Sequence, residues 1–397
     1  MASKPRHVAV MLDLEWSHKR HAAIFAGAQQ YALEQGWHTV IDEFADECLP
    51  VQPTGSLPYD GIIARATEKL ADRARRLHLP VVNVWFGSPA SKRLPGVFPD
   101  FAAGGRLVAE HLLSRGLRRF AVLRRADRAV QSQAAAFRQV VQAAGCSCVV
   151  GSYPVHLSRS YSQWRQFQQR MEAWMEGWQP PVGVFAATEE VGRMIVQMCH
   201  RRLWRVPQDV AIVAGNNELT LCEHPRPSLS SLERGYEKVG YEAARLLEGL
   251  MNARQTRASR SLPQAPQPPQ IHLPPVDVVV RESTDSIAAD DKLVVAALQF
   301  ISKNCHRSIG REDVARAVFA ETRTLQNHFR KWLGRPIAAE IRRVRIERAK
   351  RELADTRRSL AEIALDAGFG TATRLHQVFR RELGITPGEY RRRWLGP

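Results

Sequence analysis

Short apolar runs alternate with amphipathic segments along the first two thirds of the chain. The run HVAVMLDL at 7–14 has the length of a buried strand, and the segment 18–36 has the apolar spacing of a helix that ends at Gly36. The alternation continues through GIIAR, VVNVW, RFAVLRR, GVFAAT and VAIVAG. Strands separated by helices of this length need right-handed crossovers, so the pattern predicts an α/β domain with parallel sheets, and its many repeats favour two lobes. Ligands of such folds bind beyond the carboxyl ends of the strands.

A change of composition interrupts this alternation. Residues 252–275 are rich in Pro, Gln and Arg and show no periodicity, which predicts a mobile surface loop. One more strand, VDVVVRES, follows at 276–283. We therefore expect a first domain at 1–283, a linker at 284–290 and a second domain at 291–397.

In the second domain every apolar pattern has the period of a helix, and one unit occurs twice. REDVARAVFA precedes ETRTLQNHFRKWLG in the first copy, and SLAEIALDAGFG precedes TATRLHQVFRRELG in the second. A short helix, a tight turn and a second helix with an exposed cationic face are typical of a helix-turn-helix. Arg can bond guanine, and Asn or Gln can bond adenine, so both faces are suited to reading base edges. The candidate DNA-binding residues are Thr322, Arg323, Gln326, Asn327 and Arg330 in the first copy and Thr371, Ala372, Arg374, Gln377 and Arg381 in the second.

The second copy carries clear signals for the start and end of its helices. Ser359 stands three residues before Glu362, which predicts a capping box at the start of the short helix. Gly368 supplies the left-handed backbone that ends a helix at low cost. Thr386, with Pro387 after it, predicts one more capped helix start.

Charge distinguishes the second domain from the first. The chain has 57 Lys and Arg against 40 Asp and Glu, a net charge of +17. Residues 290–397 hold 23 Lys and Arg against 13 Asp and Glu, so +10 of the +17 lies in the last quarter. A concentrated positive charge suits phosphate binding, because each neutralised phosphate releases counterions. The charge favours double-stranded DNA as a partner, and a solvated basic face is the alternative.

Other classes of protein lack support in the sequence. No apolar run is long enough to span a membrane and no signal peptide is present, so we expect a cytoplasmic protein. The six cysteines are scattered without metal-ligand spacing, so we expect reduced thiols, no metal and no cofactor. G-x-G-x-x-G, phosphate-binding-loop and G-x-S-x-G motifs are absent, so no catalytic residues are expected. The alternatives are a sugar-modifying or sugar-phosphate enzyme with a nucleic-acid-binding tail, and a transport binding protein, which the basic tail opposes.

The motifs IALDAGFG, RIERAK and FRRELGITPGEYR resemble the signature of AraC/XylS-type transcription activators over residues 291–394. The resemblance implies an all-α domain whose two helix-turn-helix units, joined by a long helix, enter successive major-groove segments of DNA. It implies reading helices at about 322–332 and 372–382. Thr371 to Leu375 departs from the family, which more often has a serine and aromatics there, so the target sequence stays open.

The first domain resembles LacI-type regulators and two-lobed periplasmic sugar-binding proteins. GRLVAEHLLSRGLRRFAVL and VPQDVAIVAGNNE carry this resemblance. Together the two resemblances imply a homodimeric activator of a sugar operon that acts with RNA polymerase and binds xylose or another pentose between its lobes. The candidate effector-binding residues at strand ends are Asp13, Glu15, Trp16, Trp85, Asp100, Arg124, Glu189, Asn216 and Asn217. Asn216 and Glu189 stand where relatives usually have Asp, so another pentose, a related compound or no ligand are all open.

Overall fold

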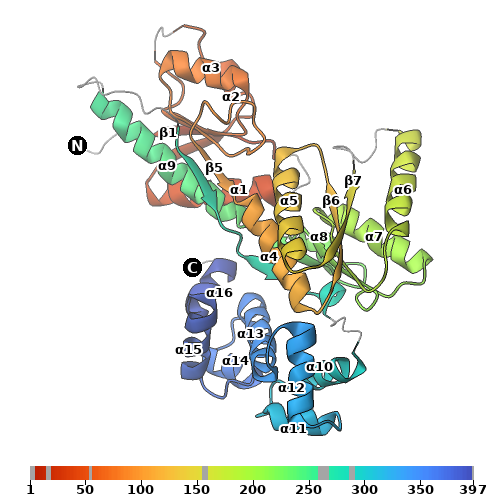
Figure 1. Cartoon of the computed structure of the whole chain (residues 1–397). Coiled ribbons are helices and arrows are strands. Elements are labelled where there is room, and N and C mark those ends of the chain that lie inside the picture. The colour runs from red at the N-terminus through yellow and green to blue at the C-terminus, as the bar shows by residue number, and fades with distance from the viewer. Residues whose placement is uncertain are drawn as a thin grey trace.

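Two α/β lobes and a helical domain follow one another along the chain (Figure 1). The structure is a computed structural model, and it describes residues 5–14, 19–52, 56–153, 160–257, 268–285 and 291–395.

The first lobe is built on a parallel sheet with the strand order β11-β5-β4-β3-β1-β2. All four residues of its central strand β3 are buried, as expected for a strand with helices on both faces. Helices α1 and α9 cover one face, and α2 and α3 cover the other. The elements are β1 (His7–Met11), α1 (Lys19–Glu34), β2 (His38–Ile41), α2 (Ala45–Cys48), β3 (Gly61–Ala64), α3 (Glu68–Leu77), β4 (Val81–Asn83), β5 (Gly96–Pro99), α9 (Tyr236–Arg257) and β11 (Gln270–Leu273).

The second lobe repeats this plan with the strand order β12-β10-β9-β8-β6-β7. Its strands are parallel except β12, which runs antiparallel to β10. Helices α6 and α7 pack on one face, and α4 and α5 on the other. The elements are α4 (Phe101–Ser114), β6 (Arg119–Arg124), α5 (Arg128–Ala143), β7 (Ser147–Ser152), α6 (Tyr161–Glu176), β8 (Val182–Phe185), α7 (Glu189–Arg201), β9 (Val210–Ala214), α8 (Leu219–Glu223), β10 (Ser230–Glu233), β12 (Asp277–Val279) and the 3₁₀ helix η1 (Glu282–Thr284).

Three short segments connect the lobes, and they lie side by side. They run from β5 to α4, from β10 to α9 and from β11 to β12. The amide of Asp100 donates to the carbonyl of Leu273 over 2.7 Å, and the amide of Val276 donates to the carbonyl of Glu233 over 2.9 Å. A change in the angle between the lobes must therefore bend all three segments together.

The helical domain contains two separate cores, one for each helix-turn-helix unit. The long helix α13 contributes to both, with Ile337 and Ile341 in the first core and Ile346, Ala349 and Leu353 in the second. The helices are α10 (Lys292–Asn304), α11 (Arg311–Ala317), α12 (Thr322–Leu333), α13 (Ile337–Asp355), α14 (Leu360–Asp366), α15 (Ala372–Leu383) and α16 (Pro387–Leu395).

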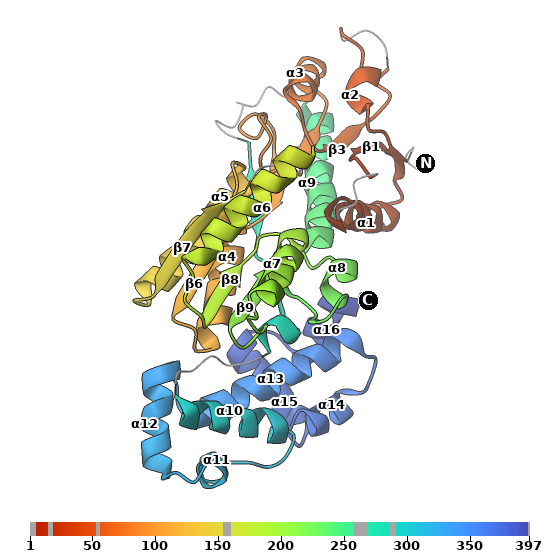
Figure 2. The same ribbon diagram turned by 90° about the vertical axis from the view of Figure 1, so that its right-hand side faces the viewer.

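The helical domain is docked against the second lobe, with α13 running along its underside (Figure 2). Lys350 of α13 forms an ion pair with Asp277, the first residue of β12. The hydroxyl of Tyr390 in α16 donates to the same carboxylate over 3.4 Å. A guanidinium nitrogen of Arg118 donates to the carbonyl of Trp332 over 2.9 Å. Asp277 thus joins a segment that crosses between the lobes to the helical domain.

The predicted fold class is confirmed: a two-lobed α/β domain on parallel sheets precedes an all-α domain with two helix-turn-helix units. The predicted loop at 252–275 is wrong at both of its ends. Helix α9 continues to Arg257, and β11 (Gln270–Leu273) pairs with β5 of the first lobe. Local periodicity did not reveal β11, because its partner strand lies far away in sequence. Residues 258–267 of that loop lie outside the described residues.

The predicted linker starts one residue too early. Thr284 is fully buried, and its hydroxyl lies 2.7 Å from that of Ser230 and 3.0 Å from His111 Nε2. Thr284 therefore packs as part of the second lobe. Residues 286–290 of the predicted linker lie outside the described part of the chain.

Candidate DNA-binding and effector sites

The first helix-turn-helix unit consists of α11 and α12. Leu325, Phe329 and Leu333 bury one face of α12 against α10, α11 and the start of α13. On the opposite face Arg323, Asn327 and Arg330 are exposed, and Thr322 and Gln326 are half-buried. The five predicted residues thus share the accessible side of the helix.

The second unit, α14 and α15, has the same construction. Leu375, Val378 and Phe379 face the core, and Arg374, Gln377 and Arg381 are exposed. The Thr371 hydroxyl accepts from the amide of Arg374 over 3.2 Å, so this side chain caps the helix. Ala372 is half-buried in the first turn.

The turn before α15 is fixed by the signals that the sequence predicted. The Ser359 hydroxyl accepts from the Glu362 amide over 3.2 Å, and the Glu362 carboxylate accepts from the Ser359 amide over 2.8 Å, which completes the capping box. Gly368 has φ +80°, and a Cβ there would lie 2.0 Å from the carbonyl oxygen of Cys305. Gly368 therefore allows both the left-handed turn and the close contact with the end of α10.

A buried ion cluster stabilises the start of α13. Glu340 is fully buried, with its carboxylate 2.5 Å from Nε of Arg335 and 2.7 Å from a terminal nitrogen of Arg343. Burial alone would raise the pKa of Glu340, but the guanidinium groups of Arg343 and Arg335 hold it below its usual value. Arg335 also donates to the carbonyl of Ser114 in the second lobe. This cluster links the first helix-turn-helix unit to the effector domain.

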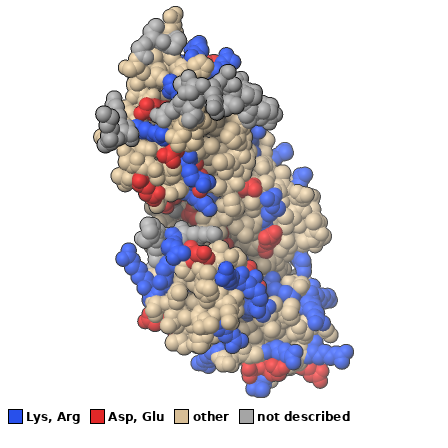
Figure 3. All heavy atoms as spheres, turned by 90° about the vertical axis from the view of Figure 1, so that its left-hand side faces the viewer, with Lys and Arg blue, Asp and Glu red and all other residues tan. Residues whose placement is uncertain are grey.

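Basic side chains are prominent on the helical domain. Figure 3 shows Lys and Arg gathered around the end of the molecule that this domain forms. Among the described residues, neither Arg323 nor Arg374 forms an ion pair with a carboxylate. These two guanidinium groups are accessible to phosphates or base edges.

The predicted effector residues lie at the carboxyl ends of strands, but they do not form one set. Asp13 follows β1 and Trp85 follows β4, both half-buried, whereas Glu15 and Trp16 lie outside the described residues. The Asp100 carboxylate caps α4 by accepting from the Ala103 amide over 2.8 Å. Asp13, Trp85 and Asp100 follow β1, β4 and β5, the kind of strand end at which ligands of such folds bind.

Arg124, which ends β6, is exposed and lines a different site. It borders a cavity of about 530 Å³ in the second lobe together with Arg138 and Tyr153. The next residue, Arg125, lines the same cavity, and its charge also lowers the pKa of Arg20 of α1.

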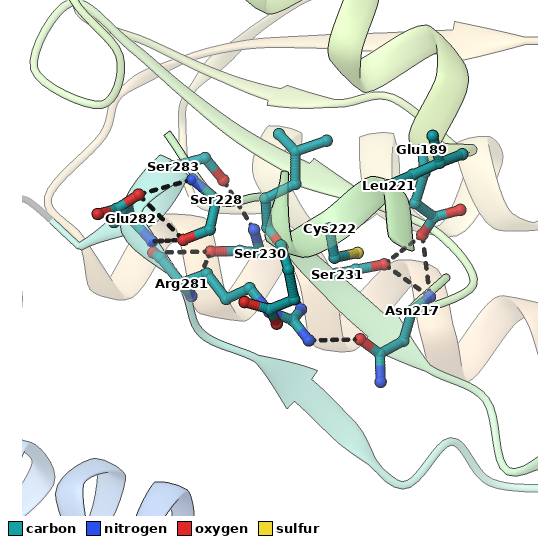
Figure 4. Close-up of polar contacts among 12 residues, drawn as sticks. Glu189, Asn217, Leu221, Cys222, Ser228, Ser230, Ser231, Arg281, Glu282 and Ser283 are labelled. Carbon is teal, nitrogen blue, oxygen red and sulfur yellow. Dashed lines mark hydrogen bonds and ion pairs between the residues drawn. The ribbon is translucent and has the colours of Figure 1, made fainter. Parts of the chain in front are cut away.

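Glu189 and Asn217 belong to a buried polar network (Figure 4). The Glu189 carboxylate accepts from the amides of Asn216 and Asn217 over 2.7 and 2.9 Å and from the Ser231 hydroxyl over 2.6 Å. The Asn217 side chain accepts from Arg281 over 2.9 Å. Protein donors therefore occupy Glu189 and Asn217, whereas Asn216 is half-buried and accepts from Nε of Arg234 over 3.2 Å.

Four arginines between the lobes were missed from the sequence. Arg65 follows β3, Arg125 follows β6, Arg234 follows β10, and Arg20 lies in the first turn of α1. Position directly after a strand was the signal available for three of them. The guanidinium carbon of Arg65 lies 3.9 Å from the centre of the Trp85 ring.

Charged groups of the second lobe affect the pKa of Arg20 in the first lobe. Burial lowers the pKa of Arg20, and the charges of Arg125 and Arg234 lower it further. Tyr236 and Asp127 raise it. Arg125 and Asp127 belong to the second lobe and Arg234 to a crossing segment, whereas Arg20 and Tyr236 belong to the first lobe.

Arg20 in turn affects the pKa of Arg65, a second arginine of the first lobe. The pKa of Arg65 is lowered by burial and then by the charge of Arg20, and Asp13 opposes the shift. Arg20 is thus affected by charged groups from both lobes, carboxylates included.

Two features of the described residues bear on other classes of protein. None of the helices in these ranges combines the length and the apolar character that a membrane crossing needs. Within the same ranges, no three His, Cys, Asp or Glu side chains are grouped so that they could hold a metal ion.

Comparisons with known proteins match both halves of the chain. Residues 109–284 match the periplasmic binding protein-like domain family, and residues 314–393 match a helix-turn-helix domain family. The xylose operon regulatory protein of Escherichia coli (strain K12) is 26% identical over 399 residues, 98% of both chains. The xylose operon regulatory protein of Haemophilus influenzae is 29% identical over 245 residues, 60% of each chain. The solved structure of the xylose-binding transcription activator XylR, 24% identical, shares the fold over 98% of this chain and 99% of its own with a TM-score of 0.56.

Proposed function

We propose that this chain activates a sugar operon when an effector binds between its lobes. It is an XylR-like DNA-binding transcription regulator in which a periplasmic-binding-protein-like domain precedes an AraC-type domain. The pair of helix-turn-helix units, each exposing arginine and amide side chains on its second helix, carries the proposal. Two relatives are named for the xylose operon, so xylose and other pentoses are the first sugars to test. We assign residues 1–284 to effector binding and 291–397 to DNA binding.

Helices α12 and α15 read the DNA in this proposal. Two units in one subunit contact successive major-groove segments, which lie roughly 34 Å apart along one face of the duplex. Arg323 and Arg374 are assigned to guanine, and Asn327 and Gln377 to adenine. Exposed arginines elsewhere in the domain supply phosphate contacts, which set orientation and affinity more than sequence preference.

The effector acts on the angle between the lobes. A ligand shifts this equilibrium only if it binds one lobe arrangement better than the other. Asp277 ends the crossing segment that joins β11 to β12, and it is paired with Lys350 of α13. Lobe closure therefore moves the anchor of the helix that connects the two DNA-binding units.

Asp13, Trp85 and Asn216 are the predicted residues that we keep as direct effector contacts. Trp85 offers an aromatic face to a sugar ring, and Asn216 both accepts and donates hydrogen bonds to hydroxyls. Glu189 holds the backbone of Asn216 in place through its hydrogen bonds and acts as a positioning residue.

We further propose a cytoplasmic homodimer that acts with RNA polymerase and catalyses no reaction. We place the contact between subunits at the edge strand β2 and its neighbours, where four apolar side chains are exposed. They are Leu33 (78% exposed), Ile41 (50%), Phe44 (68%) and Val51 (66%).

The test is a gel shift on the DNA upstream of neighbouring sugar genes, at several salt concentrations and with or without single pentoses. We expect one fragment to be retained more tightly than random DNA, and a ligand to change its affinity. Retention of every fragment at the level of random DNA, whatever the ligand, would contradict the proposal.

A further inference from the structure

Arg234 lies in a segment that crosses between the lobes, and its side chain is bonded to the second lobe. It directly follows β10, and α9 of the first lobe begins two residues later. The residue is only 4% exposed. Its Nε donates to the carbonyl of Gly215 over 2.6 Å and to Oδ1 of Asn216 over 3.2 Å. A charged group removed from water needs such partners, so these bonds fix Arg234 to the loop that follows β9.

The same guanidinium packs against the start of α4. Its carbon lies 5.0 Å from the centre of the ring of Phe101, the first residue of that helix. It also lies over Gly104, where an added Cβ would be 3.7 Å from Nη1 of Arg234. Helix α4 begins where the segment from β5 enters the second lobe. Arg234 therefore holds together the loop after β9 and two of the three segments that cross between the lobes.

The side chain of Asn216 is oriented by two partners. Its Oδ1 accepts from Nε of Arg234, and its Nδ2 donates to a carboxylate oxygen of Glu189 over 3.5 Å. Arginine only donates hydrogen bonds and a carboxylate only accepts them, so the amide has one favourable orientation. Oδ1 has a second lone pair and Nδ2 a second hydrogen. A hydroxylated ligand at Asn216 would thus meet one acceptor and one donor that are already held in place.

Resting on the proposed function, we infer that Arg234 is a positioning residue for the effector. It sets the amide of Asn216 for sugar hydroxyls, and it anchors the segment between β10 and α9 to the second lobe. The next residue, Gly235, has φ +74°, a backbone conformation that favours glycine. The chain changes direction just beyond the anchored residue, so a change in the angle between the lobes bends the segment beside the contact that holds Asn216. Effector affinity and lobe angle then depend on the same side chain.

The first test measures hydrogen exchange in the full chain without ligand. In Arg234→Met, residues 215–218 and the first turn of α4 should exchange about tenfold faster, while β8 of the same lobe should exchange as before. Arg138→Met, which removes an exposed arginine from α5, is the matched control. If Arg234→Met does not fold, Arg234→Lys takes its place, because lysine keeps the charge but has a carbon atom in the position of Nε. Unchanged exchange in residues 215–218 would overturn the inference.

The second test measures calorimetric binding of whichever pentose binds most tightly among D-xylose, L-arabinose and D-ribose. Arg234→Met and Asn216→Ala should each weaken binding about tenfold, and the double variant should be hardly weaker than either, because the two residues act through one contact. An effect of about a hundredfold in the double variant would show that Arg234 acts independently of Asn216, and it would overturn the inference, as would full affinity in Arg234→Met. If the unmodified protein binds none of the three sugars, the proposed pentose response fails, whereas hydrogen exchange still decides whether Arg234 holds Asn216.

Discussion

Replacing Lys350 with Met should uncouple the two domains. The Lys350 ammonium lies between Asp277 of β12 and Glu347 of its own helix, 3.1 Å from the latter, and the three side chains are only 8%, 16% and 20% exposed. Burial raises the pKa of Asp277, so this carboxylate depends on the ammonium to stay charged. Methionine keeps most of the unbranched side chain, removes the charge and leaves the two carboxylates without the ammonium between them.

The magnitude follows from the burial of the pair. Removing one partner of a buried ion pair costs roughly 3–5 kcal/mol, and the remaining exposure places this pair near the lower limit. A loss of about 3 kcal/mol at 1.4 kcal/mol per decade shifts the equilibrium between docked and undocked domains roughly a hundredfold.

Calorimetry and DNA binding provide the assay. We expect Lys350→Met to unfold in two separate transitions where the unmodified chain unfolds in one, and to bind DNA with an affinity that no longer responds to effector. Arg351→Met removes an exposed charge from the adjacent position of the same helix and is the matched control. The double variant Asp277→Asn/Lys350→Met should lose less stability than the sum of the losses of the two single variants. If Lys350→Met behaved like Arg351→Met in both assays, the ion pair would not couple the domains.

Four further predictions concern the helical domain. Phe319→Gly should stabilise the protein by about 1 kcal/mol in thermal unfolding. Phe319 is 99% exposed and has φ +53°, a backbone conformation that costs a non-glycine residue about 1 kcal/mol. A lower melting temperature of the variant would refute this prediction. Gly368→Ala should cost more than about 2 kcal/mol and abolish specific DNA binding, because its Cβ would meet a carbonyl at 2.0 Å; retention of normal DNA affinity would refute the role of the turn. Arg374→Ala should cost roughly 1–3 kcal/mol at the specific site and relax base preference there, whereas equal weakening on random DNA would assign it to phosphate. Because the pKa of Glu340 is lowered, its contribution to stability is present above its unfolded pKa of roughly 4.3 and is lost as the pH falls through the lower folded pKa. Glu340→Gln should remove this loss when unfolding is measured as a function of pH. An unchanged pH profile would refute the role of Glu340.

Much of the architecture could be predicted because local interactions determine it. The buried strand β3 and the helices around it follow from apolar spacing, and the capping box of Ser359 and Glu362 formed as the sequence indicated. The polar faces of α12 and α15 could also be predicted, since the period of a helix places residues three and four apart on one side. Gly368 was identified as a helix stop, but its contact with Cys305 came from the packing of two units that are distant in sequence.

The effector region was predicted less well, for a physical reason. Strand ends could be located, but the sequence does not say which side chains from different strands face each other or which are already bonded. Glu189 looked like a ligand for sugar hydroxyls, and in the fold it is bonded to the backbone of Asn216 and Asn217. Arg20 and Arg125 lie on different lobes, and only the crossing segments bring them into electrostatic contact.

The sequence by itself determined the two α/β lobes, the duplicated helix-turn-helix and the caps that begin and end their helices. Those features depend on residues within about four positions of one another, or on a period repeated along one element. The tertiary structure decided the pairing of β11 with β5, the effect of Arg125 on Arg20 and the link from Asp277 to Lys350. Each of these joins residues far apart in the chain, and their proximity follows from strand order and domain docking, which local side-chain patterns do not specify.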